Sequence, residues 1–162
     1  MLVPLFDLRV KGELRLRLDG LVAELKKTRT KILIPTPALT EFMAKADKAR
    51  DEYHQRLTQS AHFKIEPFGL RAAMECALLL GEKSHGTKRN EGATWAKVKF
   101  DWQIAATAKV AGARTIYSDD ADLVRLARRL NLQAFRLNDL PLPDAARQTD
   151  WVRDNTPPQD EG

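Results

Sequence analysis

The sequence predicts an α/β fold in which helices cover both faces of a mainly parallel sheet of about four to five strands. Short apolar runs, typical of buried strands, alternate along the chain with segments whose apolar residues recur at helical spacing. This alternation indicates βαβ units, whose strands run parallel and whose helices pack on the faces of the sheet. The length of 162 residues suits one domain, which at this size needs no disulfide to fold.

The first half of the chain is expected to begin with a helix, a strand and a second helix. Residues 13–28 have leucines at helical spacing, followed by lysines that suit a helix C-terminus. The apolar run at residues 31–35 ends in a proline and indicates a buried strand. Thr36 as the N-cap and Pro37 at the first helical position begin the next helix. Further helices are expected at residues 51–60 and 69–80, with a strand at residues 62–66 between them.

The second half continues the alternation after a gap. Residues 81–94 are rich in Gly, Lys, Ser and Asn and lack an apolar period, so they are expected to form a loop. Gly112 stands at the C′ position of a helix predicted at residues 94–111. A strand at 114–117, a helix at 120–130 and a strand at 133–137 follow. The domain is therefore expected to span residues 1–143, with a weakly ordered tail at residues 144–162.

Composition and charge limit the partners and the environment of the protein. The formal charge of +5 and the pI of about 9.5 suit a polyanionic partner, and equally a surface kept soluble by basic residues. No apolar run approaches the roughly 20 residues of a membrane span, and the start of the chain lacks a secretory signal. The single cysteine, Cys76, fits a reducing compartment. We therefore expect a cytoplasmic protein without membrane contact.

Two carboxylates follow predicted strands, where a parallel sheet binds ligands, and a third lies on a helix that could aim it at the same place. Asp119 lies two residues beyond the third predicted strand. Glu41 lies one turn into the helix that follows the first predicted strand. Asp101 lies inside a helix, and the small residues Ala105 and Ala108 on its flank would let that helix pack closely on the sheet.

Carboxylates gathered in this way suit a divalent metal ion. Mg²⁺ and Mn²⁺ prefer oxygen ligands, and a bound metal lowers the pKa of a water and stabilises charge on phosphoryl oxygens. Each acid also has a structural explanation: Glu41 as a first-turn helix acid, Asp119 or Asp120 as an N-cap, and Asp101 as an exposed residue. Taken one at a time, these residues leave both interpretations open.

Three segments, in this order, resemble the PIN-domain ribonucleases, which include the toxin nucleases of bacterial toxin–antitoxin pairs. Residues 32–41, Ile-Leu-Ile-Pro-Thr-Pro-Ala-Leu-Thr-Glu, resemble the strand and helix of that family with its acidic residue. Residues 101–108, Asp-Trp-Gln-Ile-Ala-Ala-Thr-Ala, resemble its Asp-x-x-Ile-Ala-Ala-x-Ala helix. Residues 116–123, Ile-Tyr-Ser-Asp-Asp-Ala-Asp-Leu, resemble the strand and acidic turn that follow. The resemblance spans about residues 13–140.

The resemblance implies a PIN-like three-layer α/β/α fold with a five-stranded parallel sheet, and hydrolysis of RNA phosphodiester bonds with Mg²⁺ or Mn²⁺. It assigns metal binding and catalysis to Glu41, Asp101 and Asp119, with Asp120 as the alternative to Asp119. A toxin of this family would have RNA as its substrate and an antitoxin protein as a possible partner, and a homodimer is also open.

One part of the family pattern is not matched. The family begins with an apolar strand that ends in an Asp, normally the central metal ligand. Here Asp7 after residues 2–6 is the only upstream candidate, and Pro4 does not suit a central strand. We therefore expect that strand to be missing, with Asp7 as a metal ligand in the alternative. A domain impaired in this way would bind RNA or protein without cleaving, which is the second hypothesis for its function.

Basic residues next to Asp101 are candidates for RNA contact. Lys97 and Lys99 precede it on the same predicted helix, where their ammonium groups could meet an RNA backbone. The alternative is that both lysines belong to a solvated helix face.

Overall fold

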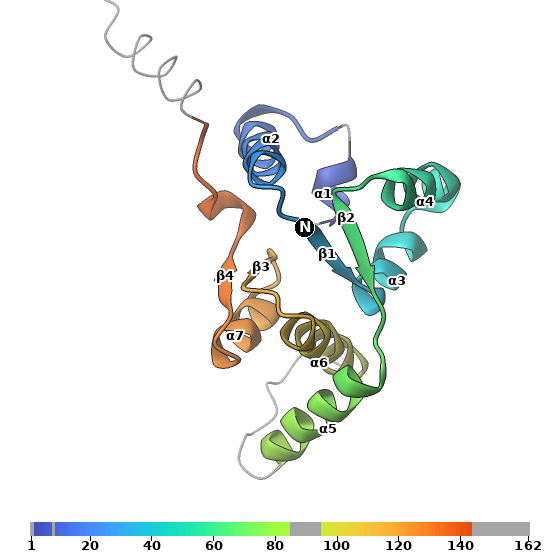
Figure 1. Cartoon of the computed structure of the whole chain (residues 1–162), viewed down its shortest axis with the longest axis vertical. Helices are drawn as coiled ribbons and strands as arrows, with labels where there is room; N and C mark the ends of the chain where they lie inside the picture. Colours follow the sequence, from blue (N-terminus) through green and yellow to red (C-terminus); the bar gives the residue numbers. More distant parts are fainter. Residues whose placement is uncertain (1, 8, 85–94, 144–162) are drawn as a thin grey trace, which may run out of the picture.

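The chain forms helices that alternate with short parallel strands (Figure 1). The computed structural model describes residues 2–7, 9–84 and 95–143. Its helices are α1 (Leu2–Phe6), α2 (Gly12–Lys27), α3 (Thr36–Ala44), α4 (Arg50–Gln59), α5 (Leu70–Ser84), α6 (Trp95–Val110) and α7 (Ala121–Arg129), with short 3-10 turns η1 (Asp47–Ala49) and η2 (Leu137–Asp139). Its strands are β1 (Ile32–Pro35), β2 (Phe63–Glu66), β3 (Thr115–Tyr117) and β4 (Gln133–Phe135). The predicted α/β class with parallel strands is confirmed.

The strands form two separate pairs. Strand β1 pairs with β2, with Leu33 opposite Lys64, and β3 pairs with β4, with Ile116 opposite Ala134. Both pairs are parallel, and within the described residues no ladder joins one pair to the other. A fifth strand, which the family resemblance implies, is not found among the described residues.

Helix α6 connects the two pairs of strands. It contacts β1 and α3, and it also packs against α5 and α7. Ala105, Ala106 and Ala108 on this helix are buried, so the prediction that small residues allow α6 to pack closely is confirmed. Gly112 follows the helix with a φ of +76°, the left-handed conformation expected at C′.

The apolar core is divided in the same way as the strands. One cluster joins α5, α6 and α7 to β3 and β4, and includes Trp102, Ile116 and Leu126. A second cluster packs α3 and α4 against β1, with Phe6 and Phe42 at its centre. A third, smaller cluster joins α2 to η2. Each pair of strands thus has its own packed core, and α6 belongs to the boundary between them.

Two segments differ from the sequence predictions. Leu2–Phe6 is a helix, so the alternative in which residues 2–6 form the first strand is wrong. The ring of Phe6 packs with Phe42, Tyr53 and Phe63, and it anchors this segment outside the β1–β2 pair. The predicted loop at residues 81–94 is helical as far as Ser84, where α5 ends.

The remainder of that predicted loop and the predicted tail lie outside the described residues. Among the helices that the structure describes, none is long and apolar enough to cross a membrane.

Candidate functional site

Asp101 is the most enclosed carboxylate of the predicted site. It lies on α6, where its side chain is only 13% exposed. Small buried residues one turn further along α6 bring the helix close to the strands, so the carboxylate lies near the carboxyl ends of β1 and β3.

The side chain of Lys97 joins three carboxylates. Its Nζ lies 2.8 Å from Asp120 Oδ2, 3.4 Å from Asp122 Oδ2 and 3.5 Å from Asp101 Oδ2. Lys97 and Asp101 are one turn apart on α6, while both other acids belong to the start of α7. The hydrogen bond to Asp120 is the main reason that the pKa of Lys97 is raised, so its ammonium is a fixed positive charge within the cluster.

The pKa of Asp101 is strongly raised by its surroundings. Burial is the largest cause, and it raises the pKa of Asp101 to about 6. The Lys97 ammonium lowers that pKa, while the negative charges of Asp120 and Glu41 raise it. Carboxylates that follow β1 and β3 therefore act on the same buried group, so both strands end at this side of the molecule.

Asp120 is held in place by hydrogen bonds to the backbone of its own turn. Its Oδ1 accepts hydrogen bonds from the backbone N–H groups of Asp122 at 2.8 Å and Leu123 at 3.2 Å, which makes it the N-cap of α7. Partial burial opposes its ionisation, but the Lys97 hydrogen bond and the two backbone hydrogen bonds outweigh this effect, and the pKa of Asp120 is lowered. The buried Ser118 hydroxyl accepts from the Asp120 N–H at 3.2 Å and fixes the same turn.

Asp119 points away from this cluster. Its Oδ1 accepts a hydrogen bond from the Leu137 N–H at 3.0 Å, which ties the turn after β3 to η2. Glu41 is exposed on α3, at the edge of the cluster. Asp7 is paired with Arg9 at 2.9 Å, and this hydrogen bond lowers the pKa of Asp7.

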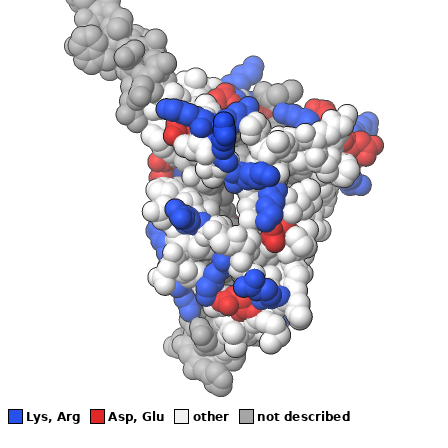
Figure 2. All heavy atoms as spheres, viewed as in Figure 1, with Lys and Arg blue, Asp and Glu red and all other residues white. Residues whose placement is uncertain are grey.

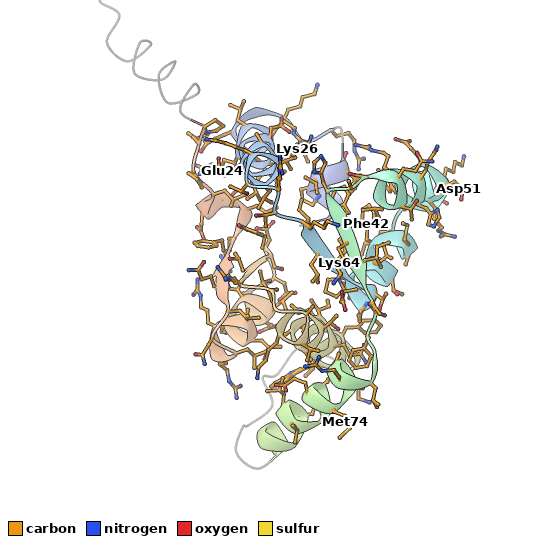
Figure 3. All side chains as sticks on the ribbon, in the orientation of Figure 1. Glu24, Lys26, Phe42, Asp51, Lys64 and Met74 are labelled. Atoms are coloured by element: carbon orange, nitrogen blue, oxygen red, sulfur yellow. The ribbon has the colours of Figure 1, made fainter. Side chains whose placement is uncertain are left out.

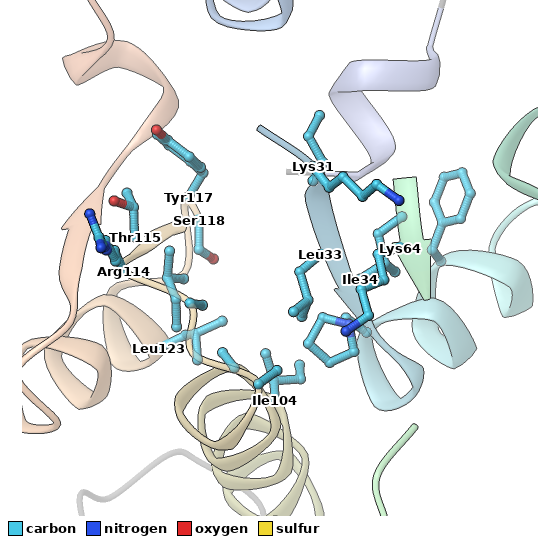
Figure 4. A pocket seen from close by; sticks show the side chains of 18 of the residues that line it. Lys31, Leu33, Ile34, Lys64, Ile104, Arg114, Thr115, Tyr117, Ser118 and Leu123 are labelled. Atoms are coloured by element: carbon cyan, nitrogen blue, oxygen red, sulfur yellow. The ribbon is translucent and has the colours of Figure 1, made fainter. Parts of the chain in front are cut away.

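The carboxylates stand at one end of a long groove between the two pairs of strands. The groove has a volume of about 720 Å³, and Glu41, Asp101 and Asp120 belong to its lining. Figure 4 shows Leu33 facing Thr115, Tyr117 and Ser118 across it, with Ile104 of α6 below.

Comparison of the sequence with known protein families identifies the family to which this fold belongs. The PIN domain family matches residues 12–129, which is more than half of the chain. The chain belongs to the PIN domain family. The predicted family and its three-layer α/β/α fold are therefore confirmed. A comparison with curated proteins gives no match.

A PIN domain is a nuclease-type fold that generally depends on divalent metal ions and has RNA as the expected substrate. The oxygen donors present here have the chemistry that Mg²⁺ and Mn²⁺ prefer. Within the described residues, however, no three Asp, Glu, His or Cys side chains are arranged to hold a metal ion. The cation on which Asp101, Asp120 and Asp122 converge is the Lys97 ammonium. The donor types of this PIN domain therefore fit a metal, provided that the lysine moves aside.

Sequence reasoning named Asp101, Asp120 and Lys97 as separate candidates, but not the ion pairs that join these residues to one another and to Asp122. Lys97 was predicted to contact RNA, and in the structure it also pairs with the acids. Its spacing of four residues before Asp101 is the signal that indicates an ion pair on one helix face. Lys99 is exposed on the same helix of the PIN domain.

Proposed function

We propose that this PIN domain is a divalent-metal-dependent endoribonuclease that hydrolyses RNA phosphodiester bonds in the cytoplasm. The observation that supports it most is the buried carboxylate of Asp101, flanked by the negative charges of Asp120 and Glu41. A hard cation beside these three groups would relieve their repulsion. In this proposal Glu41, Asp101 and Asp120 hold Mg²⁺ or Mn²⁺. Asp120 is preferred to Asp119, because the Asp119 carboxylate accepts a hydrogen bond from the Leu137 N–H instead.

Each residue then has a distinct task. A bound metal ion supplies a water of lowered pKa and stabilises charge on the phosphoryl oxygens. Asp101 is held in place by its helix. Asp120 is held by the hydrogen bonds that it accepts from two backbone N–H groups. Lys97, released from the carboxylates, keeps its ammonium at the edge of the site, where it can pair with a phosphate of the RNA. Lys99 offers a second phosphate contact from the same helix.

The experiment is a titration of cleavage with Mg²⁺ and with Mn²⁺ on a fluorescent single-stranded RNA. Asp101→Asn keeps the shape of the side chain but removes its charge, and it should lower the cleavage rate by at least a hundredfold. Asp51→Asn is the matched control, because Asp51 lies on α4 at the outer edge of the molecule (Figure 3). Equal cleavage by wild type and Asp101→Asn, or cleavage that survives chelation by EDTA, would refute the proposal.

A second candidate function is favoured by the position of Lys97. An ammonium that already neutralises the acidic cluster is the arrangement expected in a domain that binds RNA or a protein without cleaving it. RNA binding that is unchanged by EDTA, together with no cleavage at any metal concentration, would support this function over the nuclease.

The likeness to toxin nucleases extends the proposal to a biological role. A ribonuclease of this kind would arrest growth when expressed alone, and an antitoxin protein would mask it. Growth arrest on expression of the wild type, abolished by Asp101→Asn and unaffected by Asp51→Asn, supports a toxin. Normal growth with abundant active enzyme would refute that role while leaving the ribonuclease activity intact.

A further inference from the structure

The turn between α2 and β1 contains a dense group of exposed cations. Four of the six residues at positions 26–31 are basic, and we call them the basic turn: Lys26, Lys27, Arg29 and Lys31. Within the residues that the structure describes, none of the four forms an ion pair with a carboxylate. Arg15 and Arg17 on the same helix, by contrast, pair with acids one turn away. The charge of the basic turn is therefore available to a partner.

The conformation of the turn does not explain its charge. The Thr30 N–H donates to the Leu25 carbonyl oxygen at 2.8 Å, the backbone hydrogen bond that closes a helix C-terminus. Arg29 has a φ of +54°, where glycine is the usual residue and another residue costs about 1 kcal/mol. The helix dipole accounts for Lys26 and Lys27 in the last turn of α2, but not for the cations beyond the helix. Arg29 thus holds its charge where neither helix stability nor an ion pair requires it.

The basic turn lies at the opposite end of β1 from the carboxylates of the candidate site. Lys31 directly precedes β1, whereas Glu41 follows this strand on α3. The four residues of β1 span about 13 Å. Arg114 is another exposed cation, and it directly precedes β3 at the same end. Figure 2 shows, in the orientation of Figure 1, a band of Lys and Arg side chains over α2 and the start of β1.

A polyanionic substrate is repelled by the candidate site itself. Against the ammonium of Lys97 stand four carboxylates, those of Glu41, Asp101, Asp120 and Asp122. Positive charge at the other end of the strands supplies the attraction that the site lacks. Phosphates along one strand of a nucleic acid helix are about 3.4 Å apart, so 13 Å corresponds to about four nucleotides. An RNA longer than about four nucleotides can therefore reach both places.

We propose that the basic turn is a second RNA-binding surface, which holds the phosphates of a single-stranded RNA at the end of β1 opposite the carboxylates. Its ammonium and guanidinium groups contact the sugar–phosphate backbone, so this binding is independent of base sequence. The choice of RNA as the partner rests on the proposed function, because RNA is the polyanion that a ribonuclease attracts. The basic turn takes no part in the cleavage step.

The first test is the salt dependence of RNA binding by fluorescence anisotropy. The probe is a labelled single-stranded RNA of about 20 nucleotides, longer than the site of a typical single-strand binder. EDTA is present throughout, so binding is measured without metal-dependent cleavage. The turn variant combines Lys26→Gln, Lys27→Gln and Arg29→Gln. The slope of log affinity against log salt should become shallower by about 2, and affinity at 0.1 M salt should fall about a hundredfold, the values for three phosphate contacts.

The matched control variant combines Lys11→Gln, Lys48→Gln and Arg71→Gln. These exposed cations lie at the start of α2, in η1 and on α5, and their loss lowers the formal charge by the same amount. The control should weaken RNA binding less than about threefold, since charges more than a Debye length from the RNA are screened. Equal losses in both variants would overturn the proposal, because net charge alone would then explain binding.

Two further outcomes of the same experiment would overturn the proposal. The first is a wild type that does not bind the RNA at low salt. The second is a wild type that binds polyglutamate more tightly than the RNA, because the partner of the basic turn would then be an acidic polypeptide.

Cleavage kinetics separate this proposal from the ribonuclease activity. The turn variant should raise KM for the RNA at least tenfold and change kcat less than about threefold, whereas Asp101→Asn should lower kcat. A fall in kcat as large as the rise in KM would overturn the proposal by assigning the turn to the cleavage step. Cleavage that depends on Asp101, with wild-type RNA binding by the turn variant, would overturn this proposal alone. Binding that depends on the turn, without cleavage by the wild type, would support it and refute the ribonuclease.

Discussion

The electrostatics of Asp101 predict that Asp101→Asn stabilises the protein at alkaline pH. The pKa of about 6 lies some two units above the ordinary value of 3.8, mainly because the carboxylate is buried. Each unit corresponds to about 1.36 kcal/mol, so ionised Asp101 destabilises the folded state by about 3 kcal/mol. Since its side chain is only 13% exposed, little of this effect is screened by solvent.

The sign follows from the protonation of the two states. Well below pH 3.8 the carboxyl group is protonated in both states, and the folded protein bears no penalty. As the pH rises towards 6, the unfolded chain loses this proton before the folded protein does, so stability is lost. The penalty is about 1 kcal/mol at pH 4.5 and reaches about 3 kcal/mol at pH 8. Asp101→Asn should therefore exceed the wild type in stability most at pH 8.

The assay is urea unfolding of both proteins at pH 4.5 and pH 8, in the presence of EDTA and then with Mg²⁺. Saturating metal should restore the wild type at pH 8 by about 2.7 kcal/mol at a hundred times its dissociation constant, and should restore Asp101→Asn much less. A variant that is less stable than the wild type at pH 8, or a stability difference that is the same at both pH values, would refute the reasoning.

Three further predictions concern the charge of Lys97, the hydrogen bond of Asp119 and two glycines. Lys97→Met should bind Mg²⁺ about tenfold more tightly by calorimetry, because about 1.4 kcal/mol of competition from the ammonium is removed, and Lys99→Met should change the affinity little. Asp119→Ala should lower the free energy of unfolding by about 1–2 kcal/mol through loss of its hydrogen bond to Leu137, and an unchanged urea midpoint would contradict this role. Gly112→Ala should destabilise by about 1 kcal/mol at its φ of +76°, whereas Gly81→Ala within α5 should stabilise by up to about 1 kcal/mol, both measured by thermal unfolding.

The turn after β3 shows how far a sequence can define a site. Counting along the chain brings Asp119 and Asp120 to the same place, but it does not tell which carboxylate turns inward. That choice depends on the N-cap of α7, because the cap holds Asp120 towards its own helix and towards Lys97. Asp119 then reaches the Leu137 N–H, 18 residues further along the chain. Local patterns predicted that an acid lies here, whereas a partner distant in sequence decides which one.

The strands show a similar boundary between local and distant information. The apolar runs that form β1 and β3 could be recognised as strands, since burial requires their composition. Their neighbours could not be predicted, because pairing depends on how α6 and the two cores separate the pairs. Leu2–Phe6 shows the same effect, since the aromatic contacts of Phe6 with residues distant in sequence hold this helix against α3, α4 and β2.

The division of the sheet also links the candidate site to the groove. Glu41 follows β1, Asp120 follows β3, and Asp101 lies on the helix that contacts both sides. The distance between the acids is therefore set by the separation of the two pairs of strands.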